Sequence, residues 1–360
     1  MTRRAWRIGA AVAVVSVLLS ACAQQPATDQ AQDIHGLYYL ILALALFVVV
    51  VVYAGLVWAL VRYRRRKDDD GSEPPQWYGS TRTLVLFFLF GTIIVVALFP
   101  FGEVALSRVD ENPSPIEVID VQGSQWQWSA FYPNEGVVTS GKSACSPAAQ
   151  TCAGSGHPMV IEVPIDTTVQ IHLISTDVMH EFFVSNFFFM RNALPGHPNT
   201  FTWTPNTLGT FQGQCAEFCG LGHYQMRFVV RVVSETDFLA WVKQERQSIL
   251  QITCPLATSN GLQITAHDIS WNTNCFHVQP GQTIPITVQN LDAGINHNFA
   301  IWDGIDTKHQ FFATGKFPGV ATKTFTIPQL QAGKYYFQCN VHGPAMSGVF
   351  IVGGSSKGGG

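Results

Sequence analysis

The sequence predicts a membrane-anchored, mostly-β protein in which an N-terminal two-helix transmembrane hairpin precedes two β-sandwiches. Two long apolar stretches lie before residue 102, and the rest of the chain alternates apolar and polar residues between Pro, Gly and Asn clusters. Blocks of this β-rich part also repeat. Hydrophobic residues make up 47% and charged residues only 12%, which agrees with membrane segments. The net charge of −3 gives no basic excess, so no nucleic-acid partner is expected.

Residues 1–22 have the order of a secretory signal. Arg3, Arg4 and Arg7 precede an apolar run, and Leu19-Ser20-Ala21-Cys22 follows it. These last four residues resemble a bacterial lipobox, which implies a lipoprotein whose lipidated N-terminus is Cys22. The alternative is a short membrane helix. The residues that follow, up to residue 35, form a polar tether.

Two apolar stretches predict the transmembrane hairpin, which with the tether occupies residues 23–102. Residues 36–61 hold no charge and are long enough to span a bilayer, and residues 84–101 lie near the short limit. The basic run at residues 62–67 between them favours the cytoplasmic side. We therefore expect a bacterial plasma-membrane protein whose β domains lie on the periplasmic or extracellular side.

Four metal-binding side chains lie within one short loop, as Cys215, Cys219, His223 and Met226. Thiolate, thioether and imidazole groups suit copper. The loop resembles the binuclear CuA loop of heme–copper oxidase subunit II. That family adds a histidine in the context Asp-Val-x-His-x-Phe, which this chain supplies at residues 177–182 as His180.

The resemblance to subunit II implies two bridging thiolates, two terminal imidazoles, a weak thioether ligand and one backbone carbonyl. The bridging thiolates would be Cys215 and Cys219, and the terminal imidazoles His180 and His223. Met226 would be the thioether ligand, and Glu217 would supply the backbone carbonyl. The alternative is a Cys215–Cys219 disulfide, which leaves both histidines unexplained.

An internal repeat predicts a second copper site. Residues 209–215 match residues 333–339, each ending on a cysteine, and similar upstream blocks lead to His180 and His297. The second copy offers two histidines, one cysteine and one methionine, which describe a type 1 blue-copper site. They are His297, Cys339, His342 and Met346. This set resembles the cupredoxins, such as plastocyanin and amicyanin, so both sandwiches are expected to be cupredoxin-like. The alternative is a copper-free sandwich with a buried cysteine.

The surroundings of the two sites yield further expectations. Trp126 matches the first tryptophan of a Trp-x-Trp pair in the oxidase family, which implies that electrons enter there; core packing is an equal alternative. Asn298 is a candidate partner for the second site by analogy. The small apolar residues beside His342 predict either an exposed docking surface or ordinary loop packing.

Four cysteines remain outside the copper sites. Cys145 and Cys152 share one loop, and Cys254 and Cys275 flank the start of the second β unit. Each pair is a candidate for a disulfide, which implies an oxidising compartment.

The domain boundaries follow from these features. Residues 103–252 are expected to form the CuA cupredoxin domain, which ends in a linker helix that opens at Ser234. Residues 253–353 are expected to form the type 1 domain, and residues 354–360 a flexible tail.

The combined resemblance implies subunit II of a terminal heme–copper oxidase, an enzyme subunit that carries electrons but not the O2-reducing site. Electrons would pass from a periplasmic or membrane donor, through the fused type 1 copper, to CuA and the heme of oxidase subunit I, where O2 is reduced to water. Subunit I and other oxidase subunits are therefore expected partners. The alternative is a membrane-tethered copper electron-transfer protein without an oxidase partner.

Overall fold

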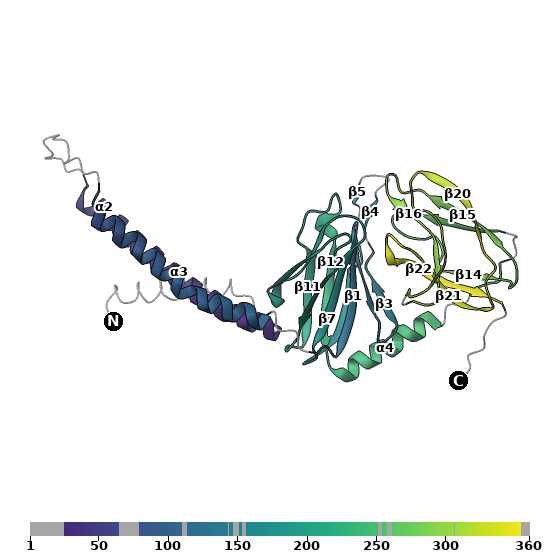
Figure 1. Ribbon diagram of the computed structural model, residues 1–360, viewed down its shortest axis with the longest axis horizontal. Coiled ribbons are helices and arrows are strands. Elements are labelled where there is room, and N and C mark those ends of the chain that lie inside the picture. Colours follow the sequence, from purple (N-terminus) through teal and green to yellow (C-terminus); the bar gives the residue numbers. More distant parts are fainter. Residues whose placement is uncertain are drawn as a thin grey trace, which may run out of the picture. The chain divides into compact units, whose positions relative to one another are not determined.

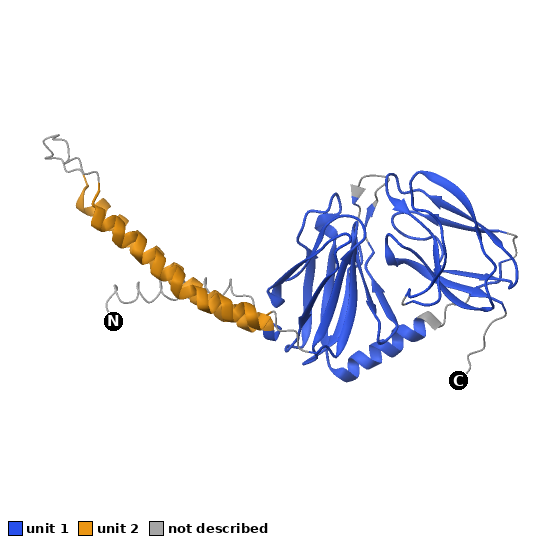
Figure 2. Cartoon of the chain, in the orientation of Figure 1, with its two compact units in different colours: residues 1–29, 112–360 blue, residues 30–111 orange. Residues whose placement is uncertain are grey.

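The computed structural model describes residues 25–64, 79–109, 114–142, 144–146, 151–152, 156–250, 254–257, 261–305 and 307–353. The chain divides into two compact units: residues 30–111 form one, and residues 1–29 with 112–360 form the other (Figure 2). The predicted signal with Cys22, most of the basic loop and the predicted tail lie outside the described residues.

Two long apolar helices make up the smaller unit, α2 (Asp29–Arg62) and α3 (Thr81–Val109). Both are long and apolar enough to cross a membrane, as predicted, and their side chains in the apolar windows are exposed. The α3 helix continues past the predicted end at residue 102 and ends at Val109. The polar residues in its last turns are helical too. There Arg108 pairs with Asp33 of α2 at 2.9 Å.

The larger unit contains a first sandwich of two five-stranded sheets (Figure 1). One sheet has the order β10-β7-β1-β2-β3, formed by Asn199–Trp203, Val169–Ser175, Glu117–Ser124, Gln127–Tyr132 and Val137–Ser140. The other has the order β6-β12-β11-β8-β9, formed by Met159–Pro164, Arg227–Val233, Gly209–Cys215, His180–Val184 and Phe189–Ala193. A short hairpin, β4 (Cys145–Ser146) and β5 (Thr151–Cys152), carries the Cys145–Cys152 disulfide.

A second sandwich follows with sheets of three and five strands. The first has the order β13-β15-β20, formed by Leu262–Ala266, Ile284–Asn290 and Ala321–Ile327. The second has the order β14-β22-β21-β17-β18, formed by Cys275–Val278, Gly343–Val352, Gly333–Cys339, Ala300–Trp302 and Gln310–Ala313. The short strands β16 (Asn296–His297) and β19 (Phe317–Pro318) pair beside them. A Cys254–Cys275 disulfide joins the start of this domain to β14.

The strand pairing of the two sandwiches confirms the internal repeat. Strand β1 runs parallel to β7 and β6 to β12, and in the second copy β13 runs parallel to β15 and β14 to β22. Strands β11 and β21, which end on the cysteines of the matched blocks, occupy equivalent places beside β12 and β22. The predicted fold of a helical hairpin followed by two cupredoxin-like sandwiches is confirmed.

Alternating side chains fill each sandwich and hold the ligand-bearing strands in place. In the first, Trp128 is fully buried and Phe182 stacks on Phe228 with ring centroids 4.2 Å apart. In the second, Phe299 and Phe337 lie 5.2 Å apart between the sheets. Burying one such aromatic side chain contributes about 1.5–3 kcal/mol.

Helix α4 (Glu235–Leu250) connects the two sandwiches and packs on the first (Figure 1). The hydroxyl of Ser234 accepts a hydrogen bond from the backbone N–H of Asp237 at 3.2 Å, which confirms the predicted N-cap. Trp241 lies 5.2 Å from the ring of Tyr132. Near its end, Arg246 donates to the backbone carbonyls of Asn134 and Glu135.

Candidate metal centres

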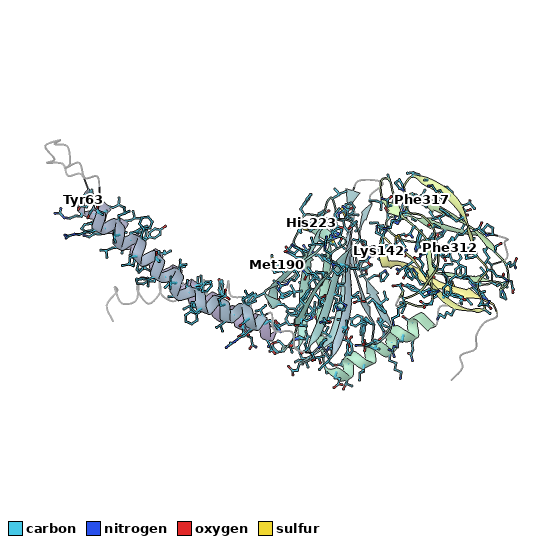
Figure 3. All side chains as sticks on the ribbon, viewed as in Figure 1. Tyr63, Lys142, Met190, His223, Phe312 and Phe317 are labelled. Atoms are coloured by element: carbon cyan, nitrogen blue, oxygen red, sulfur yellow. A yellow bond between two sulfur atoms is a disulfide. The ribbon has the colours of Figure 1, made fainter. Side chains whose placement is uncertain are left out.

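The first cluster of candidate ligands lies where β8 begins and β11 ends. His180 is the first residue of β8 and Cys215 the last of β11, and these strands are paired neighbours. The loop from Cys215 to Met226 is closed by a hydrogen bond from the Cys215 N–H to the Met226 carbonyl at 2.9 Å. It includes the short 3-10 helix η2 (His223–Gln225), whose His223 is labelled in Figure 3.

The structure brings the predicted ligand atoms of this loop together. The two cysteine sulfurs lie 3.8 Å apart, with the Nδ1 of His180 3.9 Å from Cys215 and the Nδ1 of His223 3.7 Å from Cys219. The sulfur of Met226 lies 3.8 Å from Cys219, and the carbonyl of Glu217 lies 3.2 Å from Cys215. Because a disulfide bond is only about 2.05 Å long, the alternative of a Cys215–Cys219 disulfide is wrong. Both cysteines are free and buried.

Asp177 orients His180 for a ligand on its other nitrogen. The Nε2 of His180 lies 2.9 Å from the Asp177 carboxylate, so it carries the proton and leaves Nδ1 with its lone pair toward the sulfurs. Burial would raise the pKa of Asp177, but the hydrogen bond from His180 lowers it below its ordinary value. The carboxylate therefore stays charged and fixes the ring.

The two thiols of the first cluster cannot both ionise easily in the absence of a cation. The hydrogen bond between the two thiols lowers the pKa of Cys215 and raises the pKa of Cys219. Two thiolates at this separation would repel in a buried place. A bound metal cation would relieve that repulsion, so the donor set fits a copper pair.

Trp126 packs against the ligand loop. Its indole N–H donates to the carbonyl of Cys219 at 3.0 Å, and the side-chain amide of Gln125 donates to the same carbonyl at 2.7 Å. A Cβ added at Gly222 would lie 2.6 Å from the Trp126 ring and 2.7 Å from the Cys145 sulfur. The loop therefore needs glycine there, between the tryptophan and the β4–β5 disulfide.

The second cluster has the same plan with one cysteine. Cys339 ends β21, and its sulfur lies 3.7 Å from the Nδ1 of His297 and 3.5 Å from the Nδ1 of His342. Met346 is fully buried in the same small cluster as Cys339. Its carbonyl accepts from the indole of Trp271 at 2.8 Å. Burial would raise the pKa of the Cys339 thiol, but the neighbouring histidines lower it well below its ordinary value.

Asn298 lies beside this cluster, as the analogy predicted. Its side-chain oxygen accepts from the Asn340 N–H at 2.7 Å and lies 3.7 Å from the Cys339 sulfur. It thereby ties the strand of His297 to the loop that follows Cys339.

Asp292 is a residue of the second site that sequence reasoning missed. Its carboxylate lies 2.9 Å from the Nε2 of His297, and both side chains are fully buried. It also accepts from the N–H groups of Asp268 and Ile269. Burial would lower the pKa of His297, but the bond to Asp292 raises it to about 9. The sequence did contain a signal for this role. Asp177 stands shortly before His180 in the first site, and Asp292 stands shortly before His297 in the second, although the spacing differs.

Of the two alternatives for the apolar residues beside His342, ordinary loop packing holds at Val341, His342 and Gly343, which are buried, and the exposed docking surface is excluded there. His342 is 1% and Val341 6% exposed. The backbone carbonyl of Val341 accepts from the hydroxyl of Thr176 and from the side-chain amide of Gln122, both in the first sandwich. Strand β22, which follows this loop, also packs beside β2 and β3.

Each sandwich thus holds a buried His/Cys group whose donor atoms lie within 4.8 Å of one another. Thiolate and imidazole donors with a methionine nearby favour copper over hard cations. The fold and sites define a class of protein: a copper protein with two cupredoxin-type domains that follow two helices apolar enough to cross a membrane.

Comparisons with known proteins agree with this class. Residues 117–233 match the family model "Cytochrome C oxidase subunit II, periplasmic domain", and residues 238–352 match "Cupredoxin-like domain". A probable cytochrome c oxidase subunit 2 of Streptomyces avermitilis is 31% identical over 61% of this chain and 76% of its own length. The cytochrome c oxidase subunit 2 of Cereibacter sphaeroides is 26% identical over 67% of this chain and 86% of its own length. A solved periplasmic domain of cytochrome oxidase subunit II from Bradyrhizobium japonicum is 28% identical, with a TM-score of 0.34, over 38% of this chain and 97% of that one.

The chain belongs to the cytochrome c oxidase subunit II family, with a cupredoxin domain at its C-terminal side. It is a subunit of a heme–copper oxidase, it serves electron transfer there, and it partners other oxidase subunits. Its two apolar helices suggest membrane anchoring, and the subunit II domain suggests that the copper-binding part lies on the outer side.

Proposed function

We propose that this chain is the electron-input subunit of a terminal oxidase in a respiratory chain. Electrons from a periplasmic or membrane donor enter at the second sandwich, pass to the first, and leave for the heme of a separate subunit I, where O2 is reduced to water. The observation that carries the proposal is the pair of buried cysteines Cys215 and Cys219, whose sulfurs lie 3.8 Å apart and are flanked by His180 and His223.

The residues of the first site would hold a binuclear CuA centre. Cys215 and Cys219 would hold it through their sulfurs and His180 and His223 through their imidazoles, and Asp177 keeps His180 in the tautomer that offers Nδ1. The thioether of Met226 and the carbonyl of Glu217 complete the set. Copper, when bound, supplies a site that gains and loses one electron.

The residues of the second site would hold a type 1 copper. Cys339, His297 and His342 would provide a thiolate and two imidazoles, and Met346 would provide a thioether. Asp292 and Asn298 fix the ring of His297 and the strand beside Cys339. All four ligand side chains are nearly inaccessible to solvent, which limits the reorganisation of water when charge changes.

Trp126 is a second candidate point where electrons enter the first site. Its hydrogen bond to the Cys219 carbonyl supports the role that the family resemblance implies. Replacing it with phenylalanine would test this role: reduction by an external donor should slow while both copper spectra stay unchanged. An unchanged rate would leave Trp126 as a packing residue.

The location of the chain follows from the same proposal. The hairpin lies in a bacterial plasma membrane with both sandwiches on the periplasmic side, and Cys22 carries a lipid. Protease added to intact spheroplasts should remove both sandwiches, and the mass of the N-terminal peptide should show the lipid. Protection of the sandwiches would contradict this topology.

The test of the proposed function is purification of the full-length chain from its own membranes in mild detergent. We expect a heme-containing subunit to copurify, with about three coppers per chain and both a blue type 1 signal and a mixed-valence binuclear signal in EPR spectra. A single blue copper would contradict the CuA assignment. Copper signals without a heme subunit would favour the membrane-tethered carrier without an oxidase partner.

A further inference from the structure

One backbone carbonyl of the second copper loop faces the first sandwich. Val341 lies between Asn340 and His342, and two residues after Cys339. Its carbonyl accepts a hydrogen bond from the hydroxyl of Thr176 and a second, longer one from Gln122 at 3.5 Å. The described structure thus joins the two domains by polar contacts at the loop that carries two candidate copper ligands.

The same contact excludes any other protein from this side of the loop. Gly343 has a φ of +54°, and a Cβ added there would lie 2.6 Å from the side-chain oxygen of Gln122. The positive φ favours glycine at position 343, and the Gln122 side chain of the first sandwich packs directly against it. An external donor cannot reach His342 here, so this face serves the chain's own first domain.

Thr176 is also one residue from the carboxylate that orients His180. Asp177 accepts from His180 at 2.9 Å, and it accepts from the backbone N–H groups of Gln125 and Val178, each at 2.7 Å. With a fourth, longer hydrogen bond from the Ser175 hydroxyl at 3.4 Å, these contacts hold the carboxylate in place. Thr176 is therefore fixed relative to a ligand of the first site as well as to the loop of the second.

We propose that the Thr176–Val341 hydrogen bond is the main path by which electrons pass from the second site to the first. The path runs from the Cys339–His342 backbone through the Val341 carbonyl to the Thr176 hydroxyl, along the chain to Asp177, and across its hydrogen bond to His180. Tunnelling is stronger through covalent and hydrogen bonds than across empty gaps of the same length. This path contains only two hydrogen bonds and no gap through space.

This inference rests on the proposed function, in which the second site reduces the first. One electron leaves the second site, which is oxidised, and arrives at the first, which is reduced. No bond is made or broken and no proton moves. The path delivers electrons at His180, whereas a path through Trp126 would deliver them at the Cys219 carbonyl.

Substitution of Thr176 by valine removes the hydroxyl but keeps the branched shape. In the copper-loaded full-length chain, we expect electron transfer between the sites, followed after a light-triggered one-electron injection, to slow at least about tenfold. Both copper spectra should stay unchanged. Thr200→Val, at an exposed position on β10, is the matched control and should transfer at the wild-type rate.

A second comparison separates the electron path from simple docking of the domains. Gln122→Met removes the other donor to the Val341 carbonyl without touching the chain near Asp177. In the metal-free protein, both T176V and Q122M should lower hydrogen-exchange protection of residues 339–343 by about five- to tenfold, the effect of one lost hydrogen bond. Q122M should slow electron transfer between the sites by no more than that five- to tenfold factor, and T176V should slow it by more.

The outcomes distinguish the two proposals. Wild-type transfer in T176V, or equal slowing in T176V and Q122M, would overturn the Thr176 path while leaving the proposed function intact. A larger slowing in Trp126→Phe than in T176V would also overturn it. If the wild-type chain shows no transfer between the sites, the proposed function itself fails.

Discussion

The two metal centres of this chain share one strand plan but differ in how they meet the outside. In the second centre, Cys339, His297 and Met346 are fully buried and His342 is 1% exposed. The first centre has buried sulfurs too, but large apolar side chains stand exposed on its loop, with Phe218 77% and Tyr224 61% exposed. The second loop is covered by the chain's own first sandwich, whereas the first loop presents an apolar surface of the kind that partners cover.

The largest effect should come from removing a bridging thiolate. Cys219→Ser should abolish the binuclear centre and lower the copper content from about three ions per chain to about one, because a serine hydroxyl is a poor ligand for copper. Metal analysis and EPR spectra of the full-length chain check this. Cys339→Ser is the matched control, which should remove only the blue signal. Loss of both EPR signals in either variant would contradict the independence of the two metal centres.

A smaller effect is expected from the carboxylates that orient the histidines. Asp292→Asn should weaken copper binding at the second site by about 10- to 100-fold, the usual effect of losing such a partner. Asp177→Asn should weaken the first site less, because Asp177 is 16% exposed and water can replace part of its role, whereas Asp292 is fully buried. Copper titration against a competing chelator measures both. Equal losses would contradict the contrast in burial.

The stability of the first sandwich should depend on pH through one buried carboxyl group, Glu117. Burial, with the neighbouring Glu135, raises the pKa of Glu117 from 4.5 to about 8. Between these values the folded state holds a proton that the unfolded chain has released, so stability falls as pH rises through this window and levels off above it. Glu117→Gln should remove this fall and stabilise the chain at pH 8 by up to about 4 kcal/mol, the limit that a shift of this size sets.

Denaturant unfolding of the full-length chain in detergent at pH 5 and pH 8 measures that effect. Glu235→Gln, which removes a carboxylate from an exposed position, is the control and should show the wild-type pH dependence. The same slope in Glu117→Gln as in the wild type would show that another group causes the fall.

The smallest effect concerns the connection between the sandwiches. Ser234→Ala removes the oxygen that accepts from the Asp237 N–H, and should destabilise α4 by about 1 kcal/mol. Hydrogen exchange of the first turn of α4 measures this directly. Ser248→Ala, in the last turn of the same helix, is the control and should leave hydrogen exchange of the first turn unchanged. Unchanged protection in Ser234→Ala would show that packing of Phe238 alone fixes the helix start.

The ligand loops could be predicted because their residues are close in sequence. Cys215, Cys219 and His223 are set four apart, and the strand that precedes Cys215 repeats before Cys339, so spacing and repetition reveal both clusters. The alternating pattern and the apolar stretches likewise predicted the sandwiches and the hairpin. In each case a local pattern determines the local structure.

Features that depend on contacts between distant segments could not be predicted. Asp292 follows no motif, and its role exists only because β15 ends beside His297. The apolar residues around His342 left an exposed surface and ordinary packing equally open, because nothing in their own sequence records that Gln122 and Thr176 contact this loop. The end of α3 was also missed, because Glu103, Ser107 and Arg108 interrupt the apolar stretch although the helix continues through them.

Helix α4 has a kinetic consequence for the proposed relay. It packs on the first sandwich through Phe238 and Trp241 and precedes the second in the same chain, so the two ligand sets cannot diffuse apart. A donor fused in this way meets its acceptor at an effective concentration set by the connection, not by the amount of protein in the membrane. Exchange between the two centres would then be first order and independent of how many copies of this chain the cell makes.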